Sequence, residues 1–118
     1  MAETVRATAR YIPMAPMKVR RIVDVVRGMG AQAAIDALSA LPHAAAIPVS
    51  KLIRSAVANA DEVGLDINSL FIAQIAADEA PGVMPGKGWR AAWGSRGRYR
   101  PIRKRSSHIT VVLEERQG

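Results

Sequence analysis

GVMPGKGWRAAWGSRGRYRPIRKRSSHIT, residues 82–110, is the segment around which this 118-residue chain is arranged. It contains eight Lys and Arg residues and no acidic residue. Residues 1–79 contain eight basic and eight acidic side chains, and the last five residues sum to −1. The formal net charge of +7 therefore arises in this one segment.

This basic segment has too few apolar side chains to build a core of its own. Its large apolar residues are separated by glycines and arginines, whereas ordering each residue costs about 1–2 kcal/mol. Positive charges at this density also repel one another. A polyanion resolves both problems, because phosphate neutralisation releases counterions and the segment becomes ordered as it binds. Nucleic acid is therefore the first predicted partner.

The composition of the remainder predicts a small aliphatic body. We expect one domain, 1–118, made of a globular body at about 1–79 and 107–118 and an extended basic hairpin at about 80–106. Cysteine is absent, which excludes disulfide frameworks and thiolate metal sites. The start, MAETVRATAR, resembles neither a signal nor a transit peptide, and no apolar run is long enough for a membrane span. We expect a soluble cytoplasmic protein.

Hydrophobic periodicity predicts the elements of this body. Alternation of period two is typical of a half-buried strand, and apolar residues at i, i+3, i+4 and i+7 indicate amphipathic helices. Pro16 suits the first position of a helix that ends at Gly28, and Pro48 must lie in or near the first turn of another. The predicted strands are 4–12, 70–77 and 109–114, and the predicted helices begin and end at about 16–28, 31–41 and 45–63.

Two strands that flank a glycine-rich segment predict one extended antiparallel hairpin. Arms of roughly fifteen residues at about 3.3 Å each reach on the order of 50 Å. The base is expected to pack on the helices, while the tip projects well beyond the body. An isolated two-stranded ribbon is at best marginally stable in water, so we expect the hairpin to become ordered on its partner.

The first predicted helix has a strongly basic outer face. It carries Lys18, Arg20, Arg21 and Arg27, with Asp24 one turn beyond Arg20. One interpretation is a solvated face with a single i,i+4 pair. The other is a side that faces phosphates, which four cations against one acid favour slightly.

The third predicted helix has a similar stripe. Lys51, Arg54, Ser55 and Asn59 lie on or beside one exposed face, and they either contact an RNA backbone or are simply solvated. In the hairpin, Trp89 and Trp93 lie four residues apart and face the same side of a ribbon. They either stack on unpaired bases or pack against each other at a looped tip.

No residues point to an enzyme, a metal or a cofactor. His43 and His108 are far apart in sequence and have no cysteine nearby, so a zinc site is not expected. His108 is predicted to form a hydrogen bond near the hairpin base or to contact RNA. Asp78 and Glu79 point to opposite faces of a strand, so we expect them to pair with Arg103–Arg105 rather than to form a catalytic pair. Phosphate-cradling and dinucleotide-binding motifs are absent.

Three stretches resemble the L twenty-two family of large-subunit ribosomal proteins. They are RYIPMAPMKVRRIVDVVRG at 10–28, KLIRSAVANA at 51–60 and GRYRPIRKRSSHITVVLEER at 97–116, the last being the most specific. The resemblance implies an α+β fold, with three helices packed on a small three-stranded antiparallel sheet and a long protruding β-hairpin. It also implies a body on the outer face of the large subunit, a hairpin threaded through rRNA, and a tip that helps line the nascent-peptide tunnel.

Some positions depart from the family pattern. Ala15 and Met17 stand where Ser and Arg are usual, and Pro101 stands where a strand residue is expected. The stretch 81–96 carries about five additional residues. With these differences, the resemblance and the charge pattern predict rRNA contacts at Lys18, Arg20, Arg21, Arg54, Asn59, Lys87, Arg90, Arg96, Arg98, Arg100, Arg103, Lys104, Arg105 and His108, and a tunnel-lining tip at Gly88, Trp89, Arg90 and Trp93.

The predicted function is that of a structural constituent of the large ribosomal subunit. We expect the chain to bind large-subunit rRNA, to support assembly and to line the exit tunnel with its hairpin tip. The expected partners are large-subunit rRNA, neighbouring large-subunit proteins and the nascent polypeptide, in the ribosome of the cytoplasm. No cofactor, metal or enzymatic activity is expected. The alternative is a free-standing architectural nucleic-acid-binding protein.

Overall fold

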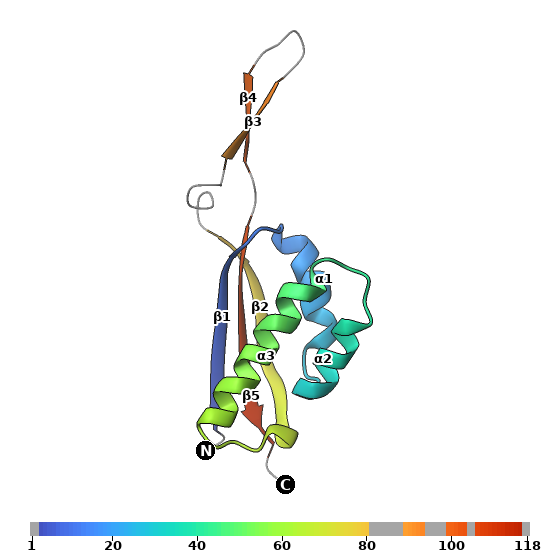
Figure 1. Ribbon diagram of the computed structural model, residues 1–118, viewed down its shortest axis with the longest axis vertical. Helices are drawn as coiled ribbons and strands as arrows, with labels where there is room; N and C mark the ends of the chain where they lie inside the picture. Colours follow the sequence, from blue (N-terminus) through green and yellow to red (C-terminus); the bar gives the residue numbers. More distant parts are fainter. Residues whose placement is uncertain (1–2, 81–88, 94–98, 104–105, 117–118) are drawn as a thin grey trace.

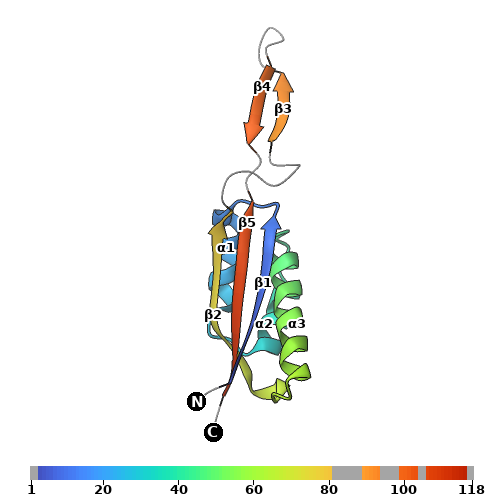
Figure 2. The ribbon, with the colours of Figure 1, turned by 90° about the vertical axis from the view of Figure 1, so that its left-hand side faces the viewer.

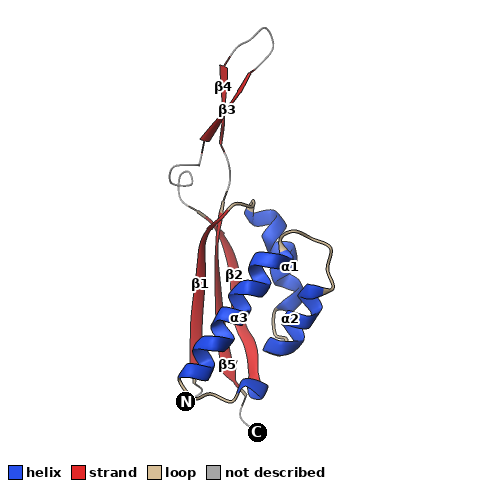
Figure 3. Cartoon of the chain, in the orientation of Figure 1, coloured by secondary structure: helices blue, strands red, loops and turns tan. Residues whose placement is uncertain are grey.

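The computed structural model describes residues 3–80 and 106–116, together with the backbone of two short strands between them. The fold is α+β, as predicted (Figure 3). In chain order the elements are β1 (Thr4–Ile12), α1 (Pro16–Val26), α2 (Ala31–Ser39), α3 (Ala46–Glu62), a 3-10 turn (Ile67–Ser69), β2 (Leu70–Glu79), β3 (Trp89–Trp93), β4 (Tyr99–Arg103) and β5 (Ser107–Glu115).

The three long strands form one antiparallel sheet in the order β1-β5-β2. All three helices cover one face of this sheet (Figure 1), while the other face has no element packed on it among the described residues (Figure 2). Strands β3 and β4 form a separate antiparallel pair beyond the ends of β2 and β5 (Figure 1). In that pair Trp89 lies opposite Arg103 and Trp93 opposite Tyr99. The predicted hairpin thus leaves the body along two of its three strands.

The core lies between the helices and the inner face of the sheet. On β5, Ile109, Val111 and Leu113 are fully buried, and the residues between them are half-buried on the open face. On α1 the inward stripe has the predicted spacing and comprises Val19, Ile22, Val23 and Val26. Burial of apolar area of this kind contributes about 25 cal/mol per Å². The core is aliphatic, as the composition predicted.

Most predicted bounds are confirmed, and the differences have local causes. β1 spans 4–12 as expected, and Pro16 occupies the start of α1. Strands β2 and β5 extend further towards the hairpin than predicted, because the ladder between them continues to the pair Glu79–Ser107. On α3 the inward stripe includes Val49, Leu52, Ile53, Ala56 and Ala60, and Val57 packs only partly against the core.

The outer edge of β2 is covered by the end of α1 and the residues that follow it. Gly28 donates its N–H to the Ile72 carbonyl at 3.1 Å, and the Ile72 N–H donates to the Met29 carbonyl at 2.8 Å. Gly28 has a φ of +83°, a left-handed conformation that glycine adopts without steric cost. The chain therefore turns after α1 and satisfies backbone groups that an edge strand would otherwise expose.

The base of the hairpin is closed by a cluster of polar contacts. Tyr11 has a φ of +54° where the β1–β5 register breaks, and its N–H donates to Nδ1 of His108 at 3.1 Å. The two rings meet edge to face, with centroids 4.7 Å apart. Next to them Ser107, which is fully buried, donates its hydroxyl to the Met14 carbonyl at 2.6 Å. His108 thus forms the hydrogen bond near the hairpin base that the sequence predicted.

We predict that Ser107→Ala lowers the free energy of unfolding by about 1–2 kcal/mol, because it leaves the Met14 carbonyl without its donor in a buried site. Chemical denaturation of the full chain measures this difference. Ser55→Ala is the matched control, since Ser55 is exposed on α3, and surface substitutions of this kind usually change stability by less than about 0.5 kcal/mol. Equal stabilities of the two variants would contradict this role of Ser107.

Candidate nucleic-acid interface

Most acidic residues of the body are concentrated at one end of its long axis. Six of the ten acidic residues lie at the end remote from β3 and β4, where α3 ends and β1 begins (Figure 1). There the Asp66 N–H donates to Oε2 of Glu115 at 3.0 Å, and the Glu115 N–H donates to the Glu3 carbonyl at 3.2 Å. Strand pairing brings Thr4 opposite Glu114 at the same end. This acidic end comprises Glu3, Asp61, Glu62, Asp66, Glu114 and Glu115.

Two of the four cations of α1 hold the helix to the edge of the sheet. Nε of Arg20 donates to the Ala77 carbonyl at 2.9 Å, and a terminal nitrogen of Arg27 donates to the Ile75 carbonyl at 2.9 Å. Arg27 also pairs with Asp24 at 2.7 Å. The expected ion pair of Asp24 therefore forms with Arg27 rather than with Arg20, because Arg20 points to β2.

The other two cations of α1, Lys18 and Arg21, are exposed and lie one helical turn apart. They line a groove of about 420 Å³ together with Met14, from the β1–α1 connection, and with residues 43–45 of the α2–α3 connection. None of the residues that line this groove is acidic. Its lining therefore offers positive charge beside an apolar surface.

A second basic region lies along α3. Lys51, Arg54, Ser55 and Asn59 are all exposed, as the sequence predicted. Lys51 and Arg54 border a groove of about 380 Å³ between α2 and α3. On the other side of the helix, Lys51 and Ser55 border a groove of about 420 Å³ against β1. Neither groove has an acidic residue among the described residues of its lining, so a phosphate bound there meets no negative charge from the lining itself.

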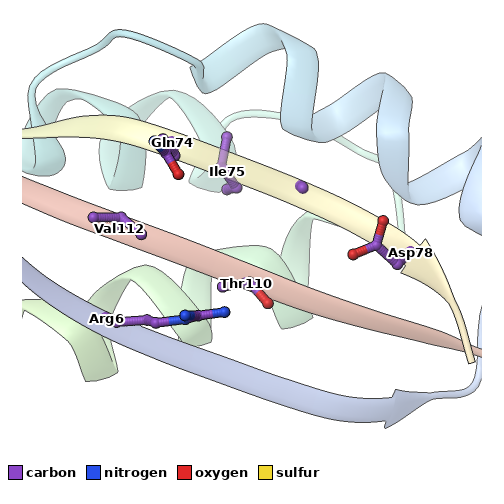
Figure 4. Close-up of a pocket in the computed structure, with 7 residues that line it drawn as sticks. Arg6, Gln74, Ile75, Asp78, Thr110 and Val112 are labelled. Carbon is purple, nitrogen blue, oxygen red and sulfur yellow. The ribbon is translucent and has the colours of Figure 1, made fainter.

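The open face of the sheet has a different character. A hollow of about 260 Å³ lies over β5, between Arg6 of β1 and Asp78 of β2. In Figure 4 the Arg6 side chain extends along the sheet towards Thr110, with Asp78 further along β2. Because charges of both signs line this hollow, a polyanion gains less from it than from the α1 and α3 grooves.

The predicted contact residues fall into three groups. On the body, Lys18, Arg21, Arg54 and Asn59 are exposed, Arg20 is bonded to the sheet edge, and His108 is half-buried at the hairpin base. Strands β3 and β4 contain Trp89, Arg90, Trp93, Arg100 and Arg103, described for their backbone alone. The remaining predicted residues, Lys87, Gly88, Arg96, Arg98, Lys104 and Arg105, lie outside the described residues.

The strand bounds also bear on the predicted hairpin tip. Three of the four residues expected there, Trp89, Arg90 and Trp93, belong to strand β3. The connection to β4 follows at 94–98, outside the described residues. Pro101 is accommodated within β4, opposite Ala91, in a two-stranded pair where each strand is an edge that tolerates a missing donor.

Sequence reasoning missed the contact of Arg27 with β2 and the place of His43 in the groove beside α1. The only sequence signal for Arg27 was its position one residue before Gly28, where α1 was predicted to end. His43 had no signal in the sequence, because its neighbours in the groove come from other elements. Among the described residues, no group of three or more His, Asp or Glu side chains is placed to hold a metal ion. None of the helices in that part of the chain has the length and apolar character to cross a membrane.

Comparisons with known proteins agree with these observations. The sequence pattern of the family described as Ribosomal protein L22p/L17e matches residues 7–114. The chain is also 43% identical over 111 residues to the large ribosomal subunit protein uL22 of Desulfatibacillum aliphaticivorans. The aligned region covers 94% of this chain and 98% of that protein. The chain belongs to this ribosomal protein family.

Membership of the L22p/L17e family makes the chain a structural constituent of the large ribosomal subunit. It places the chain in the cytoplasmic ribosome, as the sequence predicted, and implies rRNA and other ribosomal proteins as partners. The alternative of a free-standing architectural protein is thereby set aside. Within this L22p/L17e chain, the basic grooves of α1 and α3 are the described surfaces best suited to an RNA partner.

We predict that Arg27→Ala lowers the free energy of unfolding by about 1–2 kcal/mol, because it removes a charge-assisted hydrogen bond to the Ile75 carbonyl. Arg21→Ala is the matched control, since Arg21 is exposed on α1 and its side chain makes no hydrogen bond within the described residues. It is expected to leave the stability within about 0.5 kcal/mol. Urea denaturation compares the two, and a control as unstable as Arg27→Ala would contradict the anchoring role of Arg27.

Proposed function

We propose that this chain binds large-subunit rRNA through its basic segment and through the helical side of its body. The observation that carries this proposal is the position of the charge: eight basic residues and no acid lie between the two strands that leave the body. Each phosphate that these residues neutralise releases condensed counterions. The hairpin supplies most of the electrostatic attraction, and the body supplies the stable fold that holds its two arms together.

The body contributes a second, smaller set of contacts. Lys18 and Arg21 on α1, and Lys51 and Arg54 on α3, are exposed around grooves that lack acidic lining. The acidic end lies opposite the hairpin (Figure 1). This separation favours an orientation in which the hairpin end enters the RNA and the acidic end points away from it.

The hairpin has the dimensions to connect distant parts of the rRNA. The chain measures 66 Å along its longest axis, against 26 and 18 Å along the other two. We propose that the hairpin supports assembly by binding one rRNA segment near the body and another near its tip. The tip, including Gly88, Trp89, Arg90 and Trp93, lines the nascent-peptide exit tunnel and contacts the nascent polypeptide there.

The chain acts in this proposal as one ribosomal-protein domain without enzymatic activity. Its body comprises about 1–79 and 107–118, and its hairpin about 80–106. Lys87, Arg96, Arg98, Lys104 and Arg105 contact phosphates along the arms, together with Arg90, Arg100 and Arg103. Arginine suits this role because its planar guanidinium binds phosphate in a bidentate manner and stacks on bases.

Loss of hairpin charge is predicted to weaken binding in a salt-dependent manner. The variant Arg98→Gln with Arg100→Gln removes two charges from the hairpin, and we expect the slope of log K against log salt to fall by about 1.5 units. Large subunits reconstituted with the variant should lose the protein at a lower salt concentration during co-sedimentation. The matched control, Arg6→Gln with Arg116→Gln, removes two charges from the body. A control that dissociates as readily as the hairpin variant would contradict the proposal.

The tunnel contact is tested by crosslinking. A photoreactive thiol probe attached at Trp93→Cys is expected to react with a stalled nascent chain in intact ribosomes, because the tip lies in the exit path. The same probe at Gln32→Cys, on the outer side of α2, should give no such product. Equal labelling at the two positions, or none at Trp93→Cys, would rule out the tunnel contact while leaving rRNA binding in place.

A further inference from the structure

We infer that the groove between α1 and the α2–α3 connection binds a single unpaired nucleotide of the rRNA. In this arrangement Lys18 and Arg21 contact the phosphate, while the base lies against the imidazole of His43 and the side chain of Met14. The inference rests on the proposed function, since it requires rRNA as the partner. It adds a defined subsite on the body and gives His43 a role.

The fold holds the walls of this groove in place. Val19 and Ile22 are buried in the core, so Lys18 and Arg21 project to the same outer side of α1, one turn apart. Opposite them, the Ala46 N–H donates to the His43 carbonyl at 3.0 Å, and Ala45 is only 7% exposed. Figure 1 shows the α2–α3 connection passing beside the first half of α1. The backbone around His43 is thus fixed by the start of α3.

Met14, at the floor of the groove, is held in place by two hydrogen bonds. Met14 donates its N–H to the Ile12 carbonyl at 2.7 Å, and its own carbonyl accepts the hydroxyl of the buried Ser107 at 2.6 Å. Met14 therefore connects the groove to the hairpin base. A nucleotide bound here would lie next to the rRNA that the hairpin contacts.

The chemistry of the lining selects a nucleotide over other occupants. A phosphate alone would not need the apolar surface of Met14, Ala44 and Ala45, and an apolar peptide would leave two cations without partners. A nucleotide provides both an anion and a flat aromatic base. The volume of about 420 Å³ holds one nucleotide rather than a helix, and bases stack on side-chain rings only where they are unpaired.

The two grooves beside α3 lack one part of this combination. They have cations and apolar side chains, including Lys51 and Ile47, but the described residues that line them include no aromatic or imidazole ring. They suit phosphate contacts along an RNA backbone. The groove at His43 is therefore the one of the three that can hold a base by ring stacking as well as its phosphate.

Ultraviolet crosslinking of intact large subunits tests the contact in the assembled particle. We expect nucleotide adducts on the peptides that contain His43 or Met14, identified by mass spectrometry. Adducts on hairpin peptides alone would overturn the nucleotide subsite while leaving the proposed function intact. Absence of adducts from the whole chain would instead contradict rRNA binding itself.

A binding experiment with the full chain isolates the base contact. The probes are a fluorescent hexauridylate and an abasic hexamer of equal charge, and the background is Trp89→Ala with Trp93→Ala and Tyr99→Ala, so that hairpin rings do not contribute. His43→Ala is expected to weaken hexauridylate binding about fivefold and to leave the abasic affinity unchanged. Gln32→Ala, an exposed α2 control outside the groove, should change neither affinity.

The double variant Lys18→Ala with Arg21→Ala should weaken the binding of both probes, because these two residues contact the phosphate. If His43→Ala lowers the affinities for hexauridylate and for the abasic hexamer equally, or lowers neither, the proposed contact between His43 and a base is wrong. Circular dichroism of each variant verifies that the fold is retained. This double variant reports on the proposed function separately, since Lys18 and Arg21 contact the phosphate whether or not a base is bound.

Discussion

Strand β5 pairs with β1 on one side and with β2 on the other, and its inward residues Ile109, Val111 and Leu113 are fully buried beneath the helices. The hairpin depends on this burial, because its two arms continue from β2 and β5. A two-stranded ribbon is marginally stable by itself. Holding the two arms in register at the base removes much of the entropy that a free loop of this length would lose on binding.

The arginines of α1 show how one basic helix serves both the fold and its partner. Arg20 and Arg27 donate to outward-facing carbonyls of β2, an edge strand that would otherwise present unpaired backbone groups. The side chains of Lys18 and Arg21, on the adjacent side of the same helix, make no hydrogen bond within the described part of the chain. The number of cations on a helix is therefore a poor measure of its RNA-binding surface, because some of them complete the hydrogen bonding of the sheet.

Periodicity predicted the body well, because strands and helices that cover one another need one apolar face each. The bounds of β1 and the inward stripe of α1 follow directly from spacing. The contacts of Arg27 and Ser107 could not be predicted from spacing, because their partners lie 48 and 93 residues away in sequence. These contacts also depend on which strand forms the edge of the sheet. That the basic segment binds nucleic acid was predicted from its charge and from its lack of a core. Which of its side chains contact RNA depends on the partner, which the sequence of this chain does not contain.

The cluster at the hairpin base links these features. His108 and Ser107 belong to the most specific part of the family resemblance, yet both are engaged within the body, with Tyr11 and Met14. Their hydrogen bonds fix the direction in which β5 leaves the basic segment, and they fix Met14 at the floor of the α1 groove. These contacts hold the start of β5, from which one arm of the hairpin continues, against the β1–α1 connection. The functional constraint on these residues is therefore geometric, even though the contacts themselves are internal.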